Sequence, residues 1–347
     1  MSRTPTSTPP AADPDSEMIW RCPACLGEMV NSDATLACTA CGSSYEVIAG
    51  IPDLRFPKAE GESSMDDLKQ ARDIAAVAGK SSAEVLVRRF FSVREGVDGW
   101  TVSDTENRTR QSLEMPSRLR GEVSGWLGPL TDQERFLDLG CGFGGLLSAA
   151  ASLGKSGLGI DNRMLVLVIA KRLTELSGRT ATLACANAES LPLGDESIGG
   201  VVMYDVVEHV ANLEKGLSEV SRVTKAGGMF ACSTPNRFSL APEPHVHLFG
   251  VGWLPRKFQA AYVKRRNGRD YTGTRLLSAS ELSRMMKRAT GFELTVRVPP
   301  IPAGEVETAS GVRRVLATFY NSVAQKRAFR GVFLRIGPFF QAVGKKN

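Results

Sequence analysis

From residue 134 onward, short apolar runs alternate with longer segments of helical periodicity. Runs such as "RFLDLG", "SGLGID" and "ATLACA" have the length of buried strands, and "NRMLVLVIAKRLTELSG" has that of a helix ending at glycine. Parallel strands joined by crossover helices produce this alternation, because a parallel neighbour is reached only after a long connection. The sequence therefore predicts an α/β fold, a Rossmann-like sheet with helices on both faces. "FELTVRVPP" and "PFFQAVGKK" are predicted to close it, the latter as the edge strand.

The turn after the first predicted strand, "DLGCGFGG", is rich in glycine. Gly140, Gly142 and Gly144 leave room for backbone amides to approach a ligand. Asp161, which ends the second strand, suits the ribose hydroxyls of either a nicotinamide dinucleotide or S-adenosylmethionine. Asp138 separates the two, because a carboxylate repels a pyrophosphate and attracts the cationic end of an amino acid. The sequence thus favours S-adenosylmethionine.

The ordered set "FLDLGCGFGG", "GLGID", "CANAESLPL" and "STPNR" resembles the class I S-adenosylmethionine-dependent methyltransferases over residues 134–236. The resemblance implies that Asn187 and Ala188 lie at the adenine. The family more often has Asp at the first position, but an Asn carbonyl also accepts from the exocyclic amine; Asn187 could instead be a turn former. The full cofactor set implied is Asp138, Gly140, Cys141, Gly142, Gly144, Asp161, Asn162, Asn187, Ala188 and Asp205.

The run "YDVVEHV", residues 204–210, ends in a carboxylate and an imidazole. It follows the fourth predicted strand, and open α/β sheets bind ligands at the carboxyl ends of their strands. Alternatively, Glu208 and His209 begin the next helix, with structural roles only. The chain has three histidines, so imidazole chemistry must come from these. We predict His209, Glu208 and His245 as catalytic residues, with His209 as the general base or a group that orients the acceptor.

The same segment resembles the loop after the fourth strand of ubiquinone-biosynthesis O-methyltransferases. There, an acidic residue followed by xxEH lies beside the acceptor and can hold a divalent ion. Asp205, Glu208 and His209 match that spacing. The first residue is Asp where the family tends to Glu, and the shorter side chain disfavours a divalent ion at this site.

Two CxxC pairs stand twelve residues apart near the N-terminus. Four thiolates complete a tetrahedral shell and leave no open position, so the spacing predicts a structural zinc site rather than a disulfide pair or a redox motif. The segment resembles small zinc-ribbon modules, similar to the Trm112 family, that occur beside or fused to methyltransferases. The predicted zinc ligands are Cys22, Cys25, Cys38 and Cys41.

The chain divides by composition into several segments. After "STPNR", a stretch of prolines, aromatics and histidines is predicted to form a lid over the acceptor, or a surface excursion whose Trp253, Phe258 and Tyr262 pack on the sheet. The predicted units are a disordered leader (1–17), a zinc ribbon (18–57), a linker with a helical extension (58–130), the cofactor-binding core (131–236), the lid (237–290) and the closing strands with a helical insertion (291–347).

An apolar stripe with helical spacing lies between the two closing strands. We expect it to face the core, with a membrane-facing helix as the alternative. The basic residues that follow form either a solvated face or a footing for anionic lipid or RNA. The stripe consists of Val312, Val315, Leu316, Phe319, Tyr320 and Val323, and the basic residues are Lys326, Arg327, Arg330 and Arg335.

Charge and hydropathy set the remaining bounds. A net charge of +6 suits RNA, an anionic membrane surface or a phosphorylated substrate. No transmembrane segment is expected, because no window holds eighteen uninterrupted apolar residues, and the first seventeen residues lack the apolar core of a signal peptide. A cytoplasmic protein is therefore expected.

The predicted activity is S-adenosylmethionine-dependent O-methylation of a small-molecule, sugar- or lipid-linked metabolite. The alternative is an RNA base methyltransferase, since a ribbon before such a core also resembles zinc-bearing rRNA guanine methyltransferases; "STPN" differs, however, from the NPPY-like motif of amino-group methylation. A non-catalytic ligand-binding protein on the same core is a third class, disfavoured by the intact Asp138 and Asp161.

Overall fold

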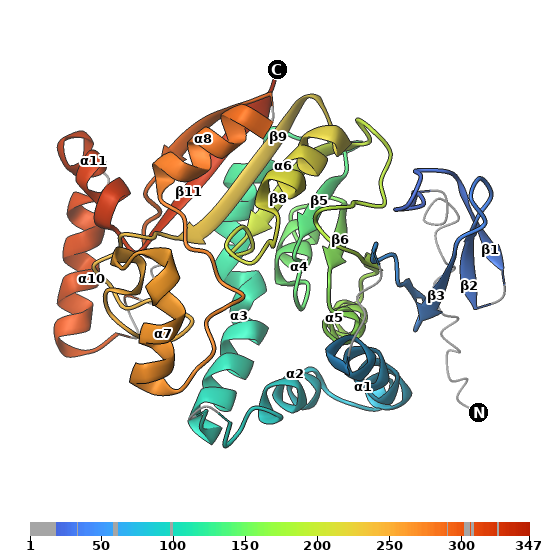
Figure 1. The fold of residues 1–347 in the computed structure, drawn as a ribbon, viewed down its shortest axis with the longest axis horizontal. Coiled ribbons are helices and arrows are strands. Elements are labelled where there is room, and N and C mark those ends of the chain that lie inside the picture. Colours follow the sequence, from blue (N-terminus) through green and yellow to red (C-terminus); the bar gives the residue numbers. More distant parts are fainter. Residues whose placement is uncertain are drawn as a thin grey trace, which may run out of the picture.

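The computed structural model describes residues 19–32, 34–57, 62–97, 100–289, 291–301, 306, 309–324 and 326–347. These residues form a seven-stranded sheet with helices on both faces and a separate four-stranded sheet beside it (Figure 1). The α/β, Rossmann-like prediction is confirmed. The leader predicted over residues 1–17 lies outside the described residues.

The large sheet has the order β10-β11-β9-β8-β5-β6-β7. Strands β5 to β9 are parallel, and β11 is antiparallel to both of its neighbours. The strands are β5 (Phe136–Leu139), β6 (Gly157–Asp161), β7 (Thr182–Cys185), β8 (Ile198–Tyr204), β9 (Thr224–Pro235), β10 (Phe292–Arg297) and β11 (Phe339–Lys346).

The predicted position of β11 at the edge is wrong, because β11 lies between β9 and β10. Ala342 pairs with Cys232 on one side and with Val296 on the other. The continuous run "FFQAV" suits a strand that is buried on both faces, whereas "FELTVR" in β10 alternates between buried and exposed side chains, as an edge strand does.

The central strands send alternate side chains into two apolar cores. In β8, Val201 and Met203 pack in the core under α6 and α8, and Val202 packs in the core under α3, α4 and α5. Because both faces are covered, these strands are apolar throughout. The covering helices are α1 (Glu62–Ala78), α2 (Ala83–Ser92), α3 (Val102–Leu127), α4 (Gly145–Ala151), α5 (Met164–Leu176), α6 (Leu213–Val223) and α8 (Ala279–Ala289).

The small sheet contacts the large one at β7, through β4 and the residues that follow it, and lies on the β6 side of the large sheet in Figure 1. Trp20 bridges to Leu193, and the Leu54 N–H donates to the carbonyl of Cys185 at 2.7 Å. The N-terminal module therefore supplies hydrogen bonds at the otherwise open edge of β7. Its strands are β1 (Met29–Ser32), β2 (Thr35–Cys38), β3 (Ser44–Ile48) and β4 (Ile51–Pro52).

A buried ion pair ties the N-terminal helices to the large sheet. Asp67 on α1 accepts from the backbone N–H groups of Met164 and Leu165, at 2.8 and 3.3 Å, and so caps the start of α5. Arg55 bonds to Asp53 at 2.7 Å and lies 3.5 Å from Asp67. One arginine therefore joins the small sheet, α1 and the start of α5.

The segment after β9 forms the 3-10 turn η1 (Val251–Trp253) and α7 (Arg256–Asn267) before reaching α8. A capping box begins α8: the Ser278 N–H donates to the Glu281 carboxylate, and the Glu281 N–H donates to the Ser278 hydroxyl. Trp253 and Phe258 are about half exposed, at 51% and 52%, so they do not pack on the sheet as the alternative reading required.

The expectation that the apolar stripe faces the core is wrong. The helix forms as predicted, as α10 (Gly311–Val323), and is followed by α11 (Arg327–Ile336). Tyr320 packs against Phe333 of α11, but Val312, Val315, Leu316 and Phe319 are 60–73% exposed. The periodicity identified an apolar face correctly, but the sheet core is already closed by other helices.

Within the described part of the chain, none of the helices is both long enough and apolar enough to span a membrane.

Candidate cofactor and acceptor site

The glycine-rich turn between β5 and α4 adopts backbone conformations that favour glycine. Gly140, Gly142 and Gly144 have φ of 78°, 50° and 74°. A Cβ on Gly140 would also lie 2.3 Å from a methyl group of Val206, so no side chain fits there without displacing the loop after β8. Cys141 turns its side chain into the core, which leaves its backbone to form the turn.

Two carboxylates flank this turn. Asp161, at the end of β6, accepts from the N–H groups of Gly142 and Arg163, each at 3.0 Å. Each oxygen keeps a second lone pair that can accept from a ribose hydroxyl. Asp138 in β5 is 2% exposed, and its Oδ2 has no hydrogen-bond partner among the described residues. A buried, unpartnered carboxylate is costly by itself, and it fits a cationic ligand group.

The pKa values of these groups reflect that cost. Burial, together with the nearby charge of Asp161, raises the pKa of Asp138 to about 8. Burial also raises the pKa of Asp161, although its bonds from the N–H groups of Gly142 and Arg163 oppose the shift. Without a cationic ligand, Asp138 is therefore protonated at neutral pH.

The residues expected at the adenine contact the N-terminal module. Asn187 donates from its side-chain amide to the carbonyl of Phe56 at 3.2 Å. The backbone carbonyl of Asn162 accepts from Arg55 at 3.3 Å. The side chains of Asn187 and Ala188 are partly exposed, at the end of β7 next to Asp161. The tail of the small sheet thus borders this side of the candidate cofactor site.

The loop after β8 brings the second half of the site together. Asp205 has φ of 55°, a left-handed conformation that Asp tolerates better than most residues. Its Oδ1 has no hydrogen-bond partner among the described residues. Burial is the main reason that the pKa of Asp205 is raised to about 8, and the negative charge of Glu208 adds to the shift. Glu208 is 1% exposed and accepts from Thr234 at 2.9 Å through Oε2. Burial also raises the pKa of Glu208.

The imidazoles of His209 and His245 lie next to each other and close to Glu208. The Nε2 atoms of His209 and His245 are 3.1 Å apart, and His245 Nε2 lies 4.0 Å from Glu208 Oε1. The structure thus brings together all three residues predicted to be catalytic.

Glu243 orients His245, and the sequence reading missed it. Glu243 is 4% exposed; its Oε1 lies 2.5 Å from His245 Nδ1, and its Oε2 accepts from the N–H groups of His245 and Val246. Burial lowers the pKa of His245, but the bond to Glu243 and the charges of Glu208 and Asp205 outweigh it, so the pKa is raised. The available signal was "EPH", a carboxylate two residues before an imidazole.

The hydrogen bonds fix where the protons of the histidine pair lie. Nδ1 of His209 faces the carbonyl of Gly273 at 3.3 Å, and Nδ1 of His245 faces Glu243, so both carry hydrogen. Two Nε2 lone pairs would then face each other unless a cation lies between them. This arrangement can accept one proton between the two Nε2 atoms or, together with Glu208 Oε1, hold a metal ion.

The donor set for a divalent ion differs from the predicted one. Ligand atoms of Glu208, His209 and His245 lie within 4.8 Å of one another. The structure brings His245, rather than Asp205, to the other two. One carboxylate and two imidazoles fit a divalent transition ion.

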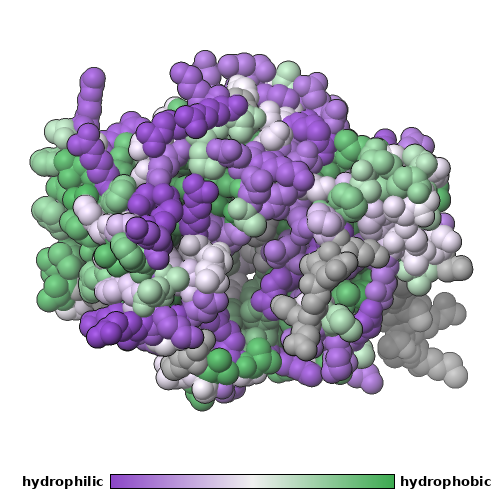
Figure 2. All heavy atoms as spheres, viewed as in Figure 1, coloured by the Kyte–Doolittle hydropathy of each residue, from purple (hydrophilic) through white to green (hydrophobic). Residues whose placement is uncertain are grey.

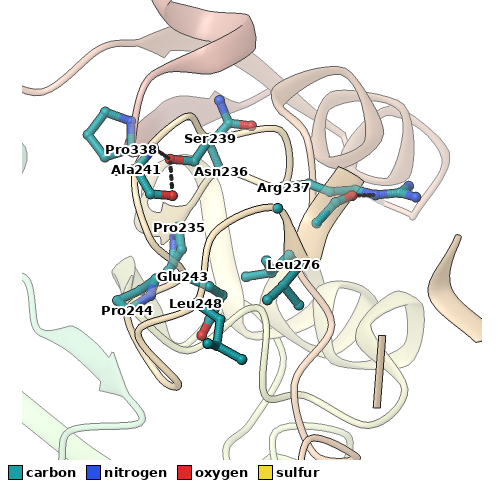
Figure 3. A pocket seen from close by; sticks show the side chains of 13 residues that line it. Pro235, Asn236, Arg237, Ser239, Ala241, Glu243, Pro244, Leu248, Leu276 and Pro338 are labelled. Atoms are coloured by element: carbon teal, nitrogen blue, oxygen red, sulfur yellow. Dashed lines mark hydrogen bonds between the residues drawn. The ribbon is translucent and has the colours of Figure 1, made fainter. Parts of the chain in front are cut away.

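Two hollows are lined in part by the segment between β9 and α8. The one in Figure 3, beside Glu243, Leu248 and Leu276, has a volume of about 10 Å³, which is room for about one water molecule. A groove of about 730 Å³ runs between Trp253, the start of α8 and α11. Residues 275–278 connect this groove to the histidine pair, since the N–H of Arg275 donates to the carbonyl of Glu208 and Ser278 lines the groove.

The four N-terminal cysteines form a compact cluster. The Sγ atoms of Cys22 and Cys41 are 3.7 Å apart and those of Cys25 and Cys38 are 3.5 Å apart. A tetrahedron with metal–sulfur bonds of about 2.3 Å has edges of about 3.8 Å, whereas a disulfide needs about 2.05 Å. The antiparallel sheet and this cluster fit the predicted zinc ribbon.

Comparisons with known proteins agree with this geometry. Residues 137–232 match the family described as Methyltransferase domain. The ubiquinone biosynthesis O-methyltransferase of Cereibacter sphaeroides is 35% identical over 126 residues, which are 35% of this chain and 49% of that protein. The enzyme of the same name from Dinoroseobacter shibae is 37% identical over 126 residues, 35% of this chain and 50% of that protein. The chain spans about half the length of the curated relatives it matches.

Among solved structures, a phosphoethanolamine N-methyltransferase 2 from Haemonchus contortus aligns with a TM-score of 0.47 and 17% identity. The alignment covers 75% of this chain and 60% of that one.

We expect Asp138→Asn to stabilise the ligand-free protein at high pH. The folded protein keeps the Asp138 proton up to about pH 8, whereas the unfolded chain loses it near pH 4. The native state therefore binds more protons over this interval, and wild type loses stability as the pH rises from about 4 to about 8. The substitution should raise the free energy of unfolding at pH 8 by on the order of 1–3 kcal/mol, with no gain at pH 4.

Urea unfolding at several pH values measures this difference. The exposed Asp66→Asn serves as the control and should follow wild type throughout. An Asp138→Asn protein less stable than wild type at pH 8 would show that the carboxylate already has a favourable partner.

Proposed function

We propose that this chain, whose residues 137–232 form a class I methyltransferase domain, transfers a methyl group from S-adenosylmethionine to an oxygen of a small-molecule, sugar- or lipid-linked acceptor. The observation that carries the cofactor assignment is the buried Asp138, with its unpartnered Oδ2 beside the glycine turn. An ammonium group would neutralise this carboxylate, whereas a pyrophosphate would add a second negative charge.

The residues around the turn fit the rest of the cofactor. Asp161 would accept from the ribose hydroxyls, and the backbone of residues 140–144 would pass close to the ligand because the glycines lack side chains. Asn187 and Ala188 would border the adenine. When bound, S-adenosylmethionine supplies a methyl group on a strongly electrophilic sulfonium.

The histidine pair would receive the proton that an acceptor hydroxyl must lose. Each Nδ1–H is held by a fixed acceptor, so each Nε2 is directed at the same point. Glu208 and Glu243 provide the negative charge that stabilises an imidazolium there. Methyl transfer to oxygen also matches the name of the similar proteins, ubiquinone biosynthesis O-methyltransferase.

The decisive experiment is a labelled-methyl transfer assay on fractionated extract, with wild-type protein and the Asp138→Asn variant. Label in a small-molecule or lipid fraction that is stable to mild base supports an ether product. Label in the RNA fraction alone would overturn the acceptor class, and no transfer to any fraction, despite cofactor binding, would favour a ligand-binding role.

Calorimetry with S-adenosylhomocysteine should show saturable binding that Asp161→Ala weakens at least tenfold, because up to two hydrogen bonds to a charged group are lost. The control is Asp132→Ala, whose carboxylate is 91% exposed and lies away from the turn, and it should bind like wild type. A clear preference for NAD would exclude the cofactor assignment.

His245→Ala should lower kcat about 100-fold or more, with S-adenosylhomocysteine affinity nearly unchanged, because proton transfer is lost and the cofactor half is untouched. His209→Ala should do the same, and Glu243→Gln should lower kcat less, since it leaves the imidazole present but less well oriented. His247→Ala is the matched control, as the third histidine lies in the same loop outside the cluster. A His245→Ala variant with the kcat of wild type would show that His245 does not act in proton transfer.

A chelator distinguishes a proton from a divalent ion at the histidine pair. The assay must be run where elemental analysis shows that metal at the cysteine cluster is retained. Unchanged activity supports the proton, and loss that an added ion restores would show that the pair acts through a metal.

We propose that the four cysteines hold one structural zinc ion, because their spacing and sulfur separations close a four-thiolate shell. Elemental analysis of metal-replete protein should find one zinc per chain. Cys38→Ser should lose it and lower the melting temperature, because the module and its contact with β7 depend on the metal. Cys232→Ala, a buried cysteine of the large sheet, should keep the zinc, and a native metal-free protein would contradict the proposal.

A further inference from the structure

The α10–α11 face is defined by the exposed apolar side chains of two consecutive helices. On α10 they occupy positions i, i+3, i+4 and i+7, an arc of about 100° along a helix about 20 Å long. Figure 2 shows apolar surface gathered at the edge of the molecule where Figure 1 places these helices. The members are Val312, Val315, Leu316, Phe319, Phe329 and Val332.

Helices α10 and α11 pack against each other through side chains that do not belong to the exposed apolar face. Tyr320 is 9% exposed and stacks edge-on against Phe333, with ring centroids 5.2 Å apart. Asn321 bonds twice to the backbone of Ile301, at 2.8 and 2.9 Å. The pair is therefore anchored to the chain that follows β10, and its apolar face meets no other element among the described residues.

The same two helices concentrate the positive charge of the chain. Residues 311–336 contain six Lys and Arg and no Asp or Glu. The formal net charge of the whole chain is +6, so the remainder is balanced. Among the residues that the structure describes, Arg314, Arg327, Arg330 and Arg335 make no ion pair with a carboxylate.

We propose that the α10–α11 face docks on an anionic phospholipid bilayer. The interface of such a bilayer presents negative headgroups directly above hydrocarbon, and an amphipathic helix with aromatic and aliphatic side chains flanked by Lys and Arg binds there. A second copy of the chain fits less well, because two-fold pairing would bring like charges together.

The groove of about 730 Å³ is formed partly by α11, the second helix of this face. Gly331, Leu334 and Arg335 of α11 line it together with the half-exposed Trp253. The groove therefore shares α11 with the docking face, and its lining residue Ser278 is three residues from Arg275, whose N–H donates to the carbonyl of Glu208. The docking proposal rests on the face alone and is independent of the proposed methyl transfer.

Vesicle co-sedimentation of the full chain tests the proposal. Wild type should bind vesicles of phosphatidylcholine with about 30% phosphatidylglycerol, bind pure phosphatidylcholine at least tenfold more weakly, and lose affinity as salt is raised. Leu316→Glu with Phe319→Glu should abolish binding, and Arg314→Glu with Arg327→Glu should weaken it at least tenfold.

Matched controls come from α2, which also carries exposed apolar and basic side chains. Val85→Glu with Val93→Glu, and Arg88→Glu with Arg89→Glu, should bind vesicles like wild type. Melting temperatures close to wild type establish that the α10 variants are folded.

Failure of wild type to bind anionic vesicles, or undiminished binding by the α10 variants, would overturn the proposal. A dimer that Leu316→Glu with Phe319→Glu dissociates, seen by sedimentation velocity without vesicles, would assign the face to a second copy instead. Neither result depends on cofactor binding or turnover, so both are distinguishable from failure of the proposed function.

Discussion

The contact between Gly140 and Val206 joins the two halves of the candidate site. β5 and β8 are parallel neighbours, so their carboxyl ends meet at one edge of the sheet, and the loop of each must turn away without colliding. Val206 occupies the space where a side chain at residue 140 would project. Glycine at this position lets the turn that carries Asp138 lie directly against the loop that carries Asp205, Glu208 and His209.

That close approach gathers carboxylates that the protein alone does not satisfy. Asp138, Asp205 and Glu208 each have an oxygen with no hydrogen-bond partner among the described residues, and burial raises the pKa of all three. Such an arrangement lowers the stability of the ligand-free protein, and binding of cationic groups would restore that stability. In the proposed function, a positively charged cofactor on one side and an imidazole pair that has accepted a proton on the other would supply that charge.

The sequence revealed the parts of the site that depend on local pattern. Strand ends, glycine spacing and paired cysteines are local features, and the structure has Asp138 in β5, Asp161 at the end of β6 and the four N-terminal cysteines in one cluster. Contacts between residues far apart in the sequence could not be predicted in the same way. Glu243 was missed because it orients His245 at the site only when the segment after β9 folds back towards the loop after β8. The expectation that the apolar stripe on α10 faces the core was wrong for a different reason. Amphipathic periodicity shows which face of a helix is apolar, but it does not show what packs against that face.

The N-terminal module contacts the candidate cofactor-binding half of the site. Its tail hydrogen-bonds along β7, places the Phe56 carbonyl against Asn187, and sets Arg55 against the carbonyl of Asn162. These contacts span more than a hundred residues of sequence, so they persist only while the small sheet holds its shape. Because that sheet is too small to be stable through its own core, the thiolate cluster that organises it also keeps Arg55 and Phe56 in contact with Asn162 and Asn187.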